Sequence, residues 1–191
     1  MAGAAAQGGV DDLTSSLMSD LAYYQSHPPR CVRGFTATSV EFPQTKFDGH
    51  GEDLNPAFAL ACHCGSTEHR VAGYKLSTPE GSILLSPLAL ECHACARRDA
   101  LLDTDEHGYD AELGHESSTL RMEGELQHYQ CGACSSDVLS VFMRFEYPPD
   151  LFDGSFDGTG REKEDLFTWV TCIGRCAQCN ELWIVADFEC A

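Results

Sequence analysis

Eight of the eleven cysteines form four close pairs, and their spacing indicates the chemistry they could perform. The pairs are Cys62/Cys64, Cys92/Cys95, Cys131/Cys134 and Cys176/Cys179. Two thiolates separated by one or two residues can bind one metal ion from a tight turn, and two such pairs complete a tetrahedral four-sulfur site. The four pairs therefore predict two metal sites that use these eight cysteines as ligands.

Paired cysteines have two other common uses, disulfide bonding and redox catalysis. Structural disulfides belong to oxidising compartments, and the first twelve residues lack the basic and the continuous apolar regions of a secretory signal. No apolar run approaches the roughly 18 residues that span a bilayer. We therefore expect a cytoplasmic protein with reduced thiols. A redox dithiol needs only one pair, so four pairs favour metal binding.

The expected sites are closed. Four thiolates leave no position for water or substrate, and such a site is structural rather than catalytic. Zinc is favoured over iron, although iron at the second site stays an alternative. His63 and His93 lie within the cysteine pairs and could replace a ligand, but thiolates are softer zinc donors. Sequential pairing closes each site across its own hairpin and is preferred to an interleaved arrangement.

The remaining cysteines, Cys31, Cys172 and Cys190, do not form a set. We expect buried or incidental thiols, because free cysteine behaves as a small apolar side chain. Cys172 lies four residues before Cys176 and is close enough to compete with it for a metal ion.

Acidic residues dominate the charge of the chain. There are 30 acidic and 12 basic residues, and the formal net charge is -18. An ion of charge +2 held by four thiolates carries a net charge of -2, so two such sites would bring the total to about -22. A protein that binds nucleic acid normally presents a cationic face to the phosphates. The acidic composition therefore argues against nucleic-acid binding.

The elements that must position the cysteines follow from the hydrophobic pattern. Apolar residues recur at helical spacing between Asp11 and about Gln25, and Pro28 and Pro29 end the pattern. This predicts one amphipathic helix whose apolar face covers a sheet. Residues 31–59 read as a connecting region with at most one strand, near Val40–Phe42.

Two stretches then repeat the order pair, strand, turn or loop, strand, pair, strand. The predicted strands are His69–Leu76, Ile83–Leu90 and Ala100–Leu102 in the first stretch, and Val138–Tyr147, Leu166–Ile173 and Leu182–Phe188 in the second. The inner cysteines are separated by 27 residues in the first and by 41 in the second. The repetition indicates two tandem units.

This order of pairs and strands resembles the zinc-ribbon class, and more distantly the rubredoxin-like architecture. The resemblance covers roughly residues 60–104 and 129–190. It implies a mainly β fold with an N-terminal helix and two tandem zinc ribbons of small antiparallel sheets, with two structural zinc ions. Each unit is too small to stabilise a sheet by the burial of apolar surface alone. A bound structural ion would add roughly 10 kcal/mol of folding free energy. Cys62 and Cys64 depart from the usual spacing, since only one residue separates them.

The expected boundaries are a flexible tail and helix at 1–30, a connecting region at 31–59, the first ribbon with an acidic linker at 60–116, and the second ribbon at 117–191. The function expected from closed sites and acidic charge is that of a non-catalytic zinc-binding module for protein–protein interaction, such as an adaptor, an inhibitor or an immunity-like protein. Its partner would be another protein with a basic surface.

Two alternatives stay open. A nucleic-acid-binding ribbon would need its basic residues to converge on one face: Arg30, Arg33, Arg70, Lys75, Arg97, Arg98 and Arg121. A thiol- or metal-dependent enzyme would use the free thiols or the polar segment from Asp103 to Glu112. That segment matches a calcium loop at only a few positions, and the chain contains no phosphate loop, nucleophile elbow or His-Glu-X-X-His helix. No catalytic residue is predicted.

Overall fold

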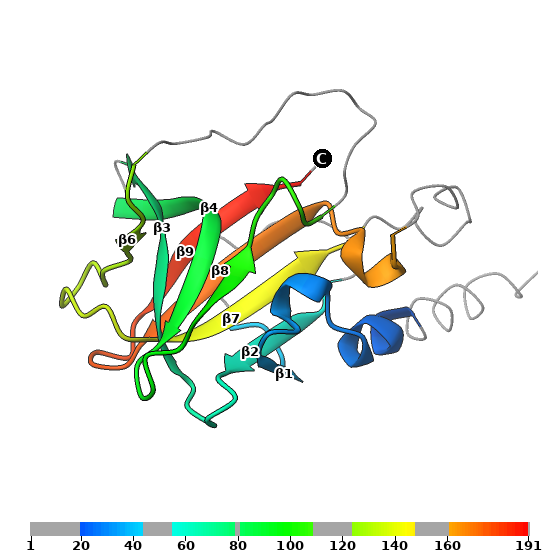
Figure 1. Ribbon diagram of the computed structural model, residues 1–191, viewed down its shortest axis with the longest axis horizontal. Coiled ribbons are helices and arrows are strands. Elements are labelled where there is room, and N and C mark those ends of the chain that lie inside the picture. The colour runs from blue at the N-terminus through cyan, green and yellow to red at the C-terminus, as the bar shows by residue number, and fades with distance from the viewer. Residues whose placement is uncertain (1–19, 44–54, 79–80, 109–123, 148–160, 191) are drawn as a thin grey trace, which may run out of the picture.

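A computed structural model describes residues 20–43, 55–78, 81–108, 124–147 and 161–190 (Figure 1). Residues 20–26 are helical. The other elements are η1 (Arg30–Val32), β1 (Thr36–Ser39), β2 (Ala57–Ala61), β3 (Glu68–Thr78), β4 (Gly81–Cys92), β5 (Arg98–Leu102), β6 (Gln127–His128), β7 (Leu139–Glu146), η3 (Lys163–Asp165), β8 (Trp169–Cys176) and β9 (Leu182–Glu189). The expected mainly β fold with an N-terminal helix is confirmed.

The strands form one nine-stranded antiparallel sheet. Its main path runs β1-β2-β7-β3-β4-β5, with β6 beside β3, and β8 between β7 and β9. The sheet curls so that β4 contacts β9, although several strands separate them in the hydrogen-bonded order (Figure 1). The two repeated units therefore share a sheet. The boundary expected between the two ribbons, at residues 116 and 117, stays a prediction.

One hydrophobic core lies inside the curled sheet and draws on both units. Phe58 of β2, Leu88 of β4, Phe145 of β7 and Phe188 of β9 belong to the same buried cluster. The ring centroids of Phe58 and Phe145 are 6.2 Å apart. Because apolar surface buried per residue rises with domain size, the shared core contributes stability that two separate small ribbons would lack.

The N-terminal helix packs on this core as expected. Tyr24 is 1% exposed and stacks on Tyr147 at 4.0 Å between ring centroids, and Leu21 also packs against the core. Tyr23 donates a hydrogen bond to Glu164 at 3.0 Å. The expected helical residues before 20 lie outside the described part. Among the residues that the structure describes, no helix has both the length and the hydropathy needed to cross a bilayer.

All six strands predicted beside the cysteine pairs are present, and one of them is shifted. The strand expected at Leu166–Ile173 is β8, which begins only at Trp169. Leu166 and Phe167 lie outside it, although both are buried. Their apolar character reflects burial in a connecting segment rather than an extended conformation.

The connecting region is more ordered than expected, because it contains the two strands β1 and β2. Val40–Phe42, the expected strand candidate, lies just after β1. β2 pairs with β7, with Phe58 opposite Met143. A partner so distant along the chain leaves no signal in the local sequence.

The first strand of each unit pairs with the hairpin of the other unit. We define the first unit as β2–β5 and the second as β6–β9. Phe58 of β2 lies opposite Met143 of β7, and Gln127 of β6 lies opposite Gly73 of β3. Phe58 and Gln127 each precede the first cysteine of their unit by four residues, and Gly73 and Met143 each follow the second cysteine by nine. The two strand pairings therefore join equivalent positions of the two units.

The same correspondence holds where the hairpins meet directly. His69 of β3 lies opposite Leu139 of β7, and each follows the second cysteine of its unit by five residues. The two units are thus related by an approximate two-fold axis that passes between His69 and Leu139. Each unit completes the sheet of the other.

Candidate metal centres

The eight paired cysteines come together in two groups of four. Cluster 1 consists of Cys62, Cys64, Cys92 and Cys95, and cluster 2 consists of Cys131, Cys134, Cys176 and Cys179. Within each cluster the four Sγ atoms lie within 4.8 Å of one another. The grouping follows the sequential pairing expected from the sequence. Both clusters could hold a metal ion.

The spacing of the sulfur atoms fits tetrahedral coordination. In cluster 1 the Sγ atoms of Cys62 and Cys95 are 3.7 Å apart and those of Cys64 and Cys92 are 3.6 Å apart. The corresponding two distances in cluster 2 are both 3.5 Å. A metal–sulfur bond of about 2.3 Å gives a tetrahedron edge of about 3.8 Å, whereas a disulfide is about 2.05 Å. All eleven cysteines are free thiols.

The same hydrogen-bonded turn holds the cysteines of each pair. At the second pair, the N–H of Cys92 donates to the carbonyl of Arg97 at 2.8 Å, and the N–H of Ala96 donates to the carbonyl of Cys92 at 2.9 Å. Equivalent bonds at the other pairs join Cys62 with Ser66 and Gly65, Cys131 with Ser136 and Ser135, and Cys176 with Glu181 and Asn180. Each pair of cysteines is therefore held in one local backbone conformation by these turns.

The residue after each second cysteine is in the left-handed region. The φ angles are 88° at Gly65, 57° at Ala96, 62° at Ser135 and 64° at Asn180. Glycine adopts this conformation freely, and asparagine does so more readily than most residues, so Gly65 and Asn180 suit these positions. The shorter Cys62–Cys64 turn uses glycine here and still brings both sulfur atoms into cluster 1.

Backbone N–H groups stabilise the thiolate form of one cysteine in each cluster. Burial raises the pKa of Cys92, but hydrogen bonds from the N–H groups of Cys95 and Ala94 and from the thiols of the cluster lower that pKa to about 6. The pKa of Cys176 is likewise lowered to about 6, against the effect of burial, by the N–H groups of Cys179 and Gln178. Backbone hydrogen bonds lower the pKa of Cys95 and Cys179, but hydrogen bonds with the other thiols of each cluster raise it to about 12. Each cluster thus favours one thiolate over its neighbours, and the thiolate is the form that binds metal.

The alternative ligands do not join either cluster. His63 and His93 are exposed, and Nδ1 of His93 lies 3.3 Å from Nη2 of Arg70. Cys172 is 1% exposed, and burial raises its pKa to about 12. Burial also raises the pKa of Cys31, and raises that of Cys190 to about 12. These three cysteines are buried thiols, and Cys172 is not part of cluster 2.

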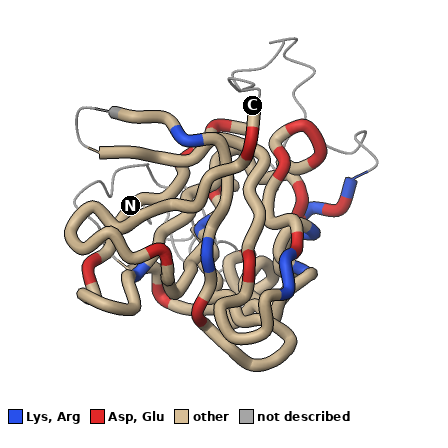
Figure 2. The backbone as a smooth tube through the Cα atoms, turned by 60° about the vertical axis from the view of Figure 1, so that its left-hand side comes forward, with Lys and Arg blue, Asp and Glu red and all other residues tan. Residues whose placement is uncertain are grey.

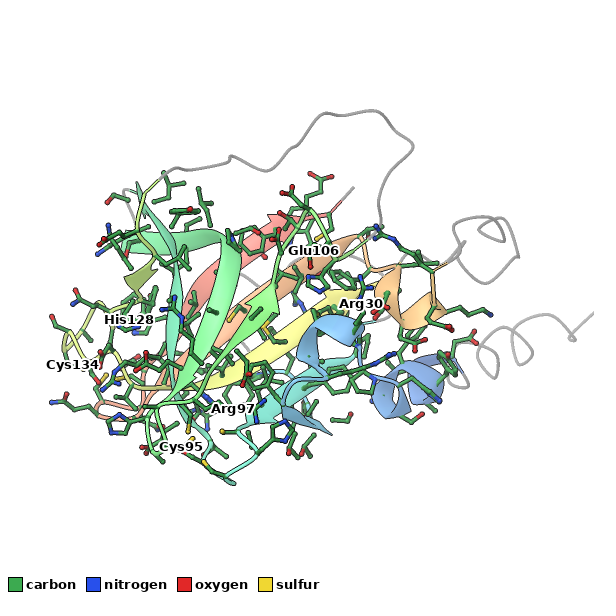
Figure 3. All side chains as sticks on the ribbon, viewed as in Figure 1. Arg30, Cys95, Arg97, Glu106, His128 and Cys134 are labelled. Carbon is green, nitrogen blue, oxygen red and sulfur yellow. The ribbon has the colours of Figure 1, made fainter. Side chains whose placement is uncertain are left out.

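The two clusters lie on either side of the junction between the units. Cys92, His69, Leu139 and Cys176 are opposite one another in a row across β4, β3, β7 and β8. Neighbouring strands are about 4.8 Å apart, so the Cα atoms of Cys92 and Cys176 are about 14 Å apart along this row. Figure 3 shows Cys95 and Cys134 at the same end of the molecule, away from Arg30 and Glu106. This end carries both candidate metal centres.

Arg70 connects the units between the two clusters. Its Nη1 atom lies 3.0 Å from Glu91 of β4, and its Nε atom lies 2.9 Å from Asp137, which follows a turn of cluster 2. From the sequence, Arg70 is expected to matter only in the nucleic-acid-binding alternative. In the structure it forms ion pairs with carboxylates of both units.

The polar segment that begins at Asp103 is described only as far as Gly108. Its Asp103 carboxylate accepts a hydrogen bond from the N–H of Asp105 at 3.0 Å, and the N–H of His107 donates to the Asp103 carbonyl at 2.8 Å. These bonds form a local turn. Within the described part of the chain, this segment contributes to no metal-binding group. Residues 109–112 lie outside that part.

Comparisons of the chain with protein families, with curated proteins and with solved structures gave no match. The two four-cysteine clusters are the feature of the described residues that points to a function.

Proposed function

We propose that this chain is a non-catalytic zinc-binding protein that acts as an acidic module for protein–protein interaction. The observation that carries the proposal is the presence of two clusters in which four sulfur atoms lie within 4.8 Å of one another, at spacings that suit tetrahedral coordination. Such a site leaves no open position for water or substrate, and structural zinc sites in proteins have this form.

Zinc is the proposed metal because four thiolates in tetrahedral geometry suit zinc, and the same donors also bind iron. Metal analysis of the purified native protein tests this point. We expect two zinc ions per chain. A chain that contained no metal after purification under reducing conditions would contradict the proposal. A visible absorption band from thiolate-to-iron charge transfer would show that the bound metal is iron and not zinc.

Charge supports the proposed interaction. The formal net charge of -18 would become about -22 with two ions bound. Several cations are neutralised by nearby carboxylates, since Arg33 lies 2.7 Å from Glu164 and Arg97 lies 2.7 Å from Asp99. Figure 2 shows basic residues spread over several segments and interleaved with acidic ones. A surface of this kind attracts a basic protein partner more readily than nucleic acid.

The ionic strength dependence of association tests the interaction. We expect retained partners to be basic proteins, with an association rate that falls steeply as salt is added, because salt screens exposed charges. Acidic partners, or an association rate that salt leaves unchanged, would contradict the proposal. A reducing compartment such as the cytoplasm is the proposed location, because the metal-binding form of each cysteine is the reduced thiolate.

A further inference from the structure

The approximate two-fold relation allows the surroundings of the two clusters to be compared position by position. Trp183 of β9 covers a turn of cluster 2. A Cβ atom placed on Gly132, between Cys131 and Cys134, would lie 2.8, 3.2 and 3.2 Å from three carbon atoms of the Trp183 indole. Trp183 and Cys134 are both partly buried and pack against the hydrophobic core. An aromatic ring thus lies directly against the turn that supplies two ligands of cluster 2.

The position equivalent to Trp183 at cluster 1 does not hold an aromatic residue. Trp183 follows Cys179 by four residues, and the equivalent residue after Cys95 is Asp99, which forms an ion pair with Arg97 at 2.7 Å. Both second cysteines of cluster 1, Cys64 and Cys95, are exposed. In cluster 2, Cys179 is exposed but Cys134 is only partly so.

Charged residues flank both clusters. Arg97 follows Cys95 by two residues, and the equivalent residue after Cys179 is Glu181; both are exposed. A divalent ion with four thiolates has a net charge of -2 and repels an anionic ligand. The residue before the third ligand reverses the difference between Arg97 and Glu181, because Glu91 precedes Cys92 and Arg175 precedes Cys176. The two clusters therefore differ in aromatic cover and in exposure rather than in flanking charge.

We propose that cluster 1 is an exchangeable metal site, which gives up its ion to anionic thiolate or carboxylate acceptors, while cluster 2 retains its ion. This inference rests on the proposed function, in which both clusters hold zinc. Transfer is a ligand exchange without oxidation or reduction. Each donor atom of the acceptor forms a bond to zinc as one cysteine–zinc bond breaks, and the released thiolate takes a proton from water.

The test uses the full chain loaded with two zinc ions and the anionic chelating dye 4-(2-pyridylazo)resorcinol. We expect two kinetic phases of one zinc each, with the first at least tenfold faster. Iodoacetamide added during the first phase, followed by mass spectrometry, should modify Cys64 and Cys95 before Cys134 and Cys179. This assignment needs no substitution, so it does not depend on whether a variant folds.

Two variants test the cause of the difference. Trp183→Ala should accelerate the slow phase severalfold, whereas Trp169→Phe, at the opposite end of β8 from Cys176, should leave both phases unchanged. Two bound zinc ions released in a single phase, or earlier modification of cluster 2, would overturn the exchangeable site and leave the zinc proposal intact. A chain that binds no zinc would overturn both.

Discussion

His69 of β3 lies directly opposite Leu139 of β7, and both side chains are 0% exposed. The two residues occupy equivalent positions in the two units, yet one is polar and the other apolar. Nε2 of His69 lies 3.3 Å from the carbonyl oxygen of Leu60, while its Nδ1 atom has no hydrogen-bond partner among the described residues. Burial lowers the pKa of His69, so the imidazole at the junction is neutral.

We expect His69→Leu to be tolerated. The substitution removes a buried nitrogen without a partner at the cost of one long hydrogen bond, so the free energy of unfolding should change by less than about 1 kcal/mol. The reverse change, Leu139→His, would bury a new polar ring and should cost about 2–4 kcal/mol. Urea denaturation of both metal-loaded variants measures the difference. If both variants lost the same free energy of unfolding, the prediction would be wrong, because His69 would then stabilise the fold as much as Leu139 does.

Neither half of the chain should fold alone. Residues 1–116 contain β2 without β7, and residues 117–191 contain β6 without β3, so each fragment loses the partner of its first strand. Each fragment would also expose its share of the common core. We expect circular dichroism to show little strand structure in either fragment and more in an equimolar mixture. One fragment that binds one zinc ion and gives a dispersed amide spectrum by itself would contradict this prediction.

The candidate site could be predicted from the sequence because its determinants are local. Each cysteine pair is held by hydrogen bonds within five residues or fewer, such as the bond from Cys92 to Arg97. The pair spacing is therefore sufficient to indicate the turn. The hairpin strands are also visible, since alternation and length are properties of the segment itself.

The joining of the two units could not be predicted, because it depends on distant partners. β6 contains only Gln127 and His128, and it is a strand because β3 lies beside it. β1 has mostly exposed side chains and pairs with β2, which in turn needs β7. A single sequence gives no information on such pairings. The spacing of the cysteine pairs indicates the tandem repeat, but it does not indicate that the first strand of each copy pairs with the other copy.

Gly73→Ala should destabilise the sheet. A Cβ atom there would lie 2.8 Å from Leu88 Cδ2, 2.9 Å from Leu84 Cβ and 2.9 Å from the backbone oxygen of Leu85. The last two atoms cannot move without shifting β4, so we expect a loss of about 1–3 kcal/mol in unfolding free energy. Gly34→Ala is the control, because no atom lies within 4 Å of its added Cβ. Thermal or urea denaturation that ranked the two variants equally would contradict the prediction.

His107 should make stability depend on pH below its ordinary pKa. Burial lowers the pKa of His107, the Arg30 guanidinium lowers it further, and a hydrogen bond with Asp103 and the charge of Glu106 act in the opposite direction. The N–H of Asp103 donates to Nδ1 of His107 at 2.9 Å, and protonation of that nitrogen removes the acceptor. The folded chain therefore resists a proton that the unfolded chain accepts.

The sign of the effect follows from this difference in proton binding. Below a pH of about 6.5 the unfolded state binds more protons at His107 than the folded state, so the free energy of unfolding falls as the pH falls. His107→Asn keeps an acceptor for the Asp103 N–H but does not titrate. We expect the variant to lose less stability than the unsubstituted chain between pH 7 and pH 5.5 in urea denaturation. Metal release at low pH affects both proteins alike, so the stability difference between them isolates His107. Parallel stability curves would show that His107 has its ordinary pKa in the folded protein.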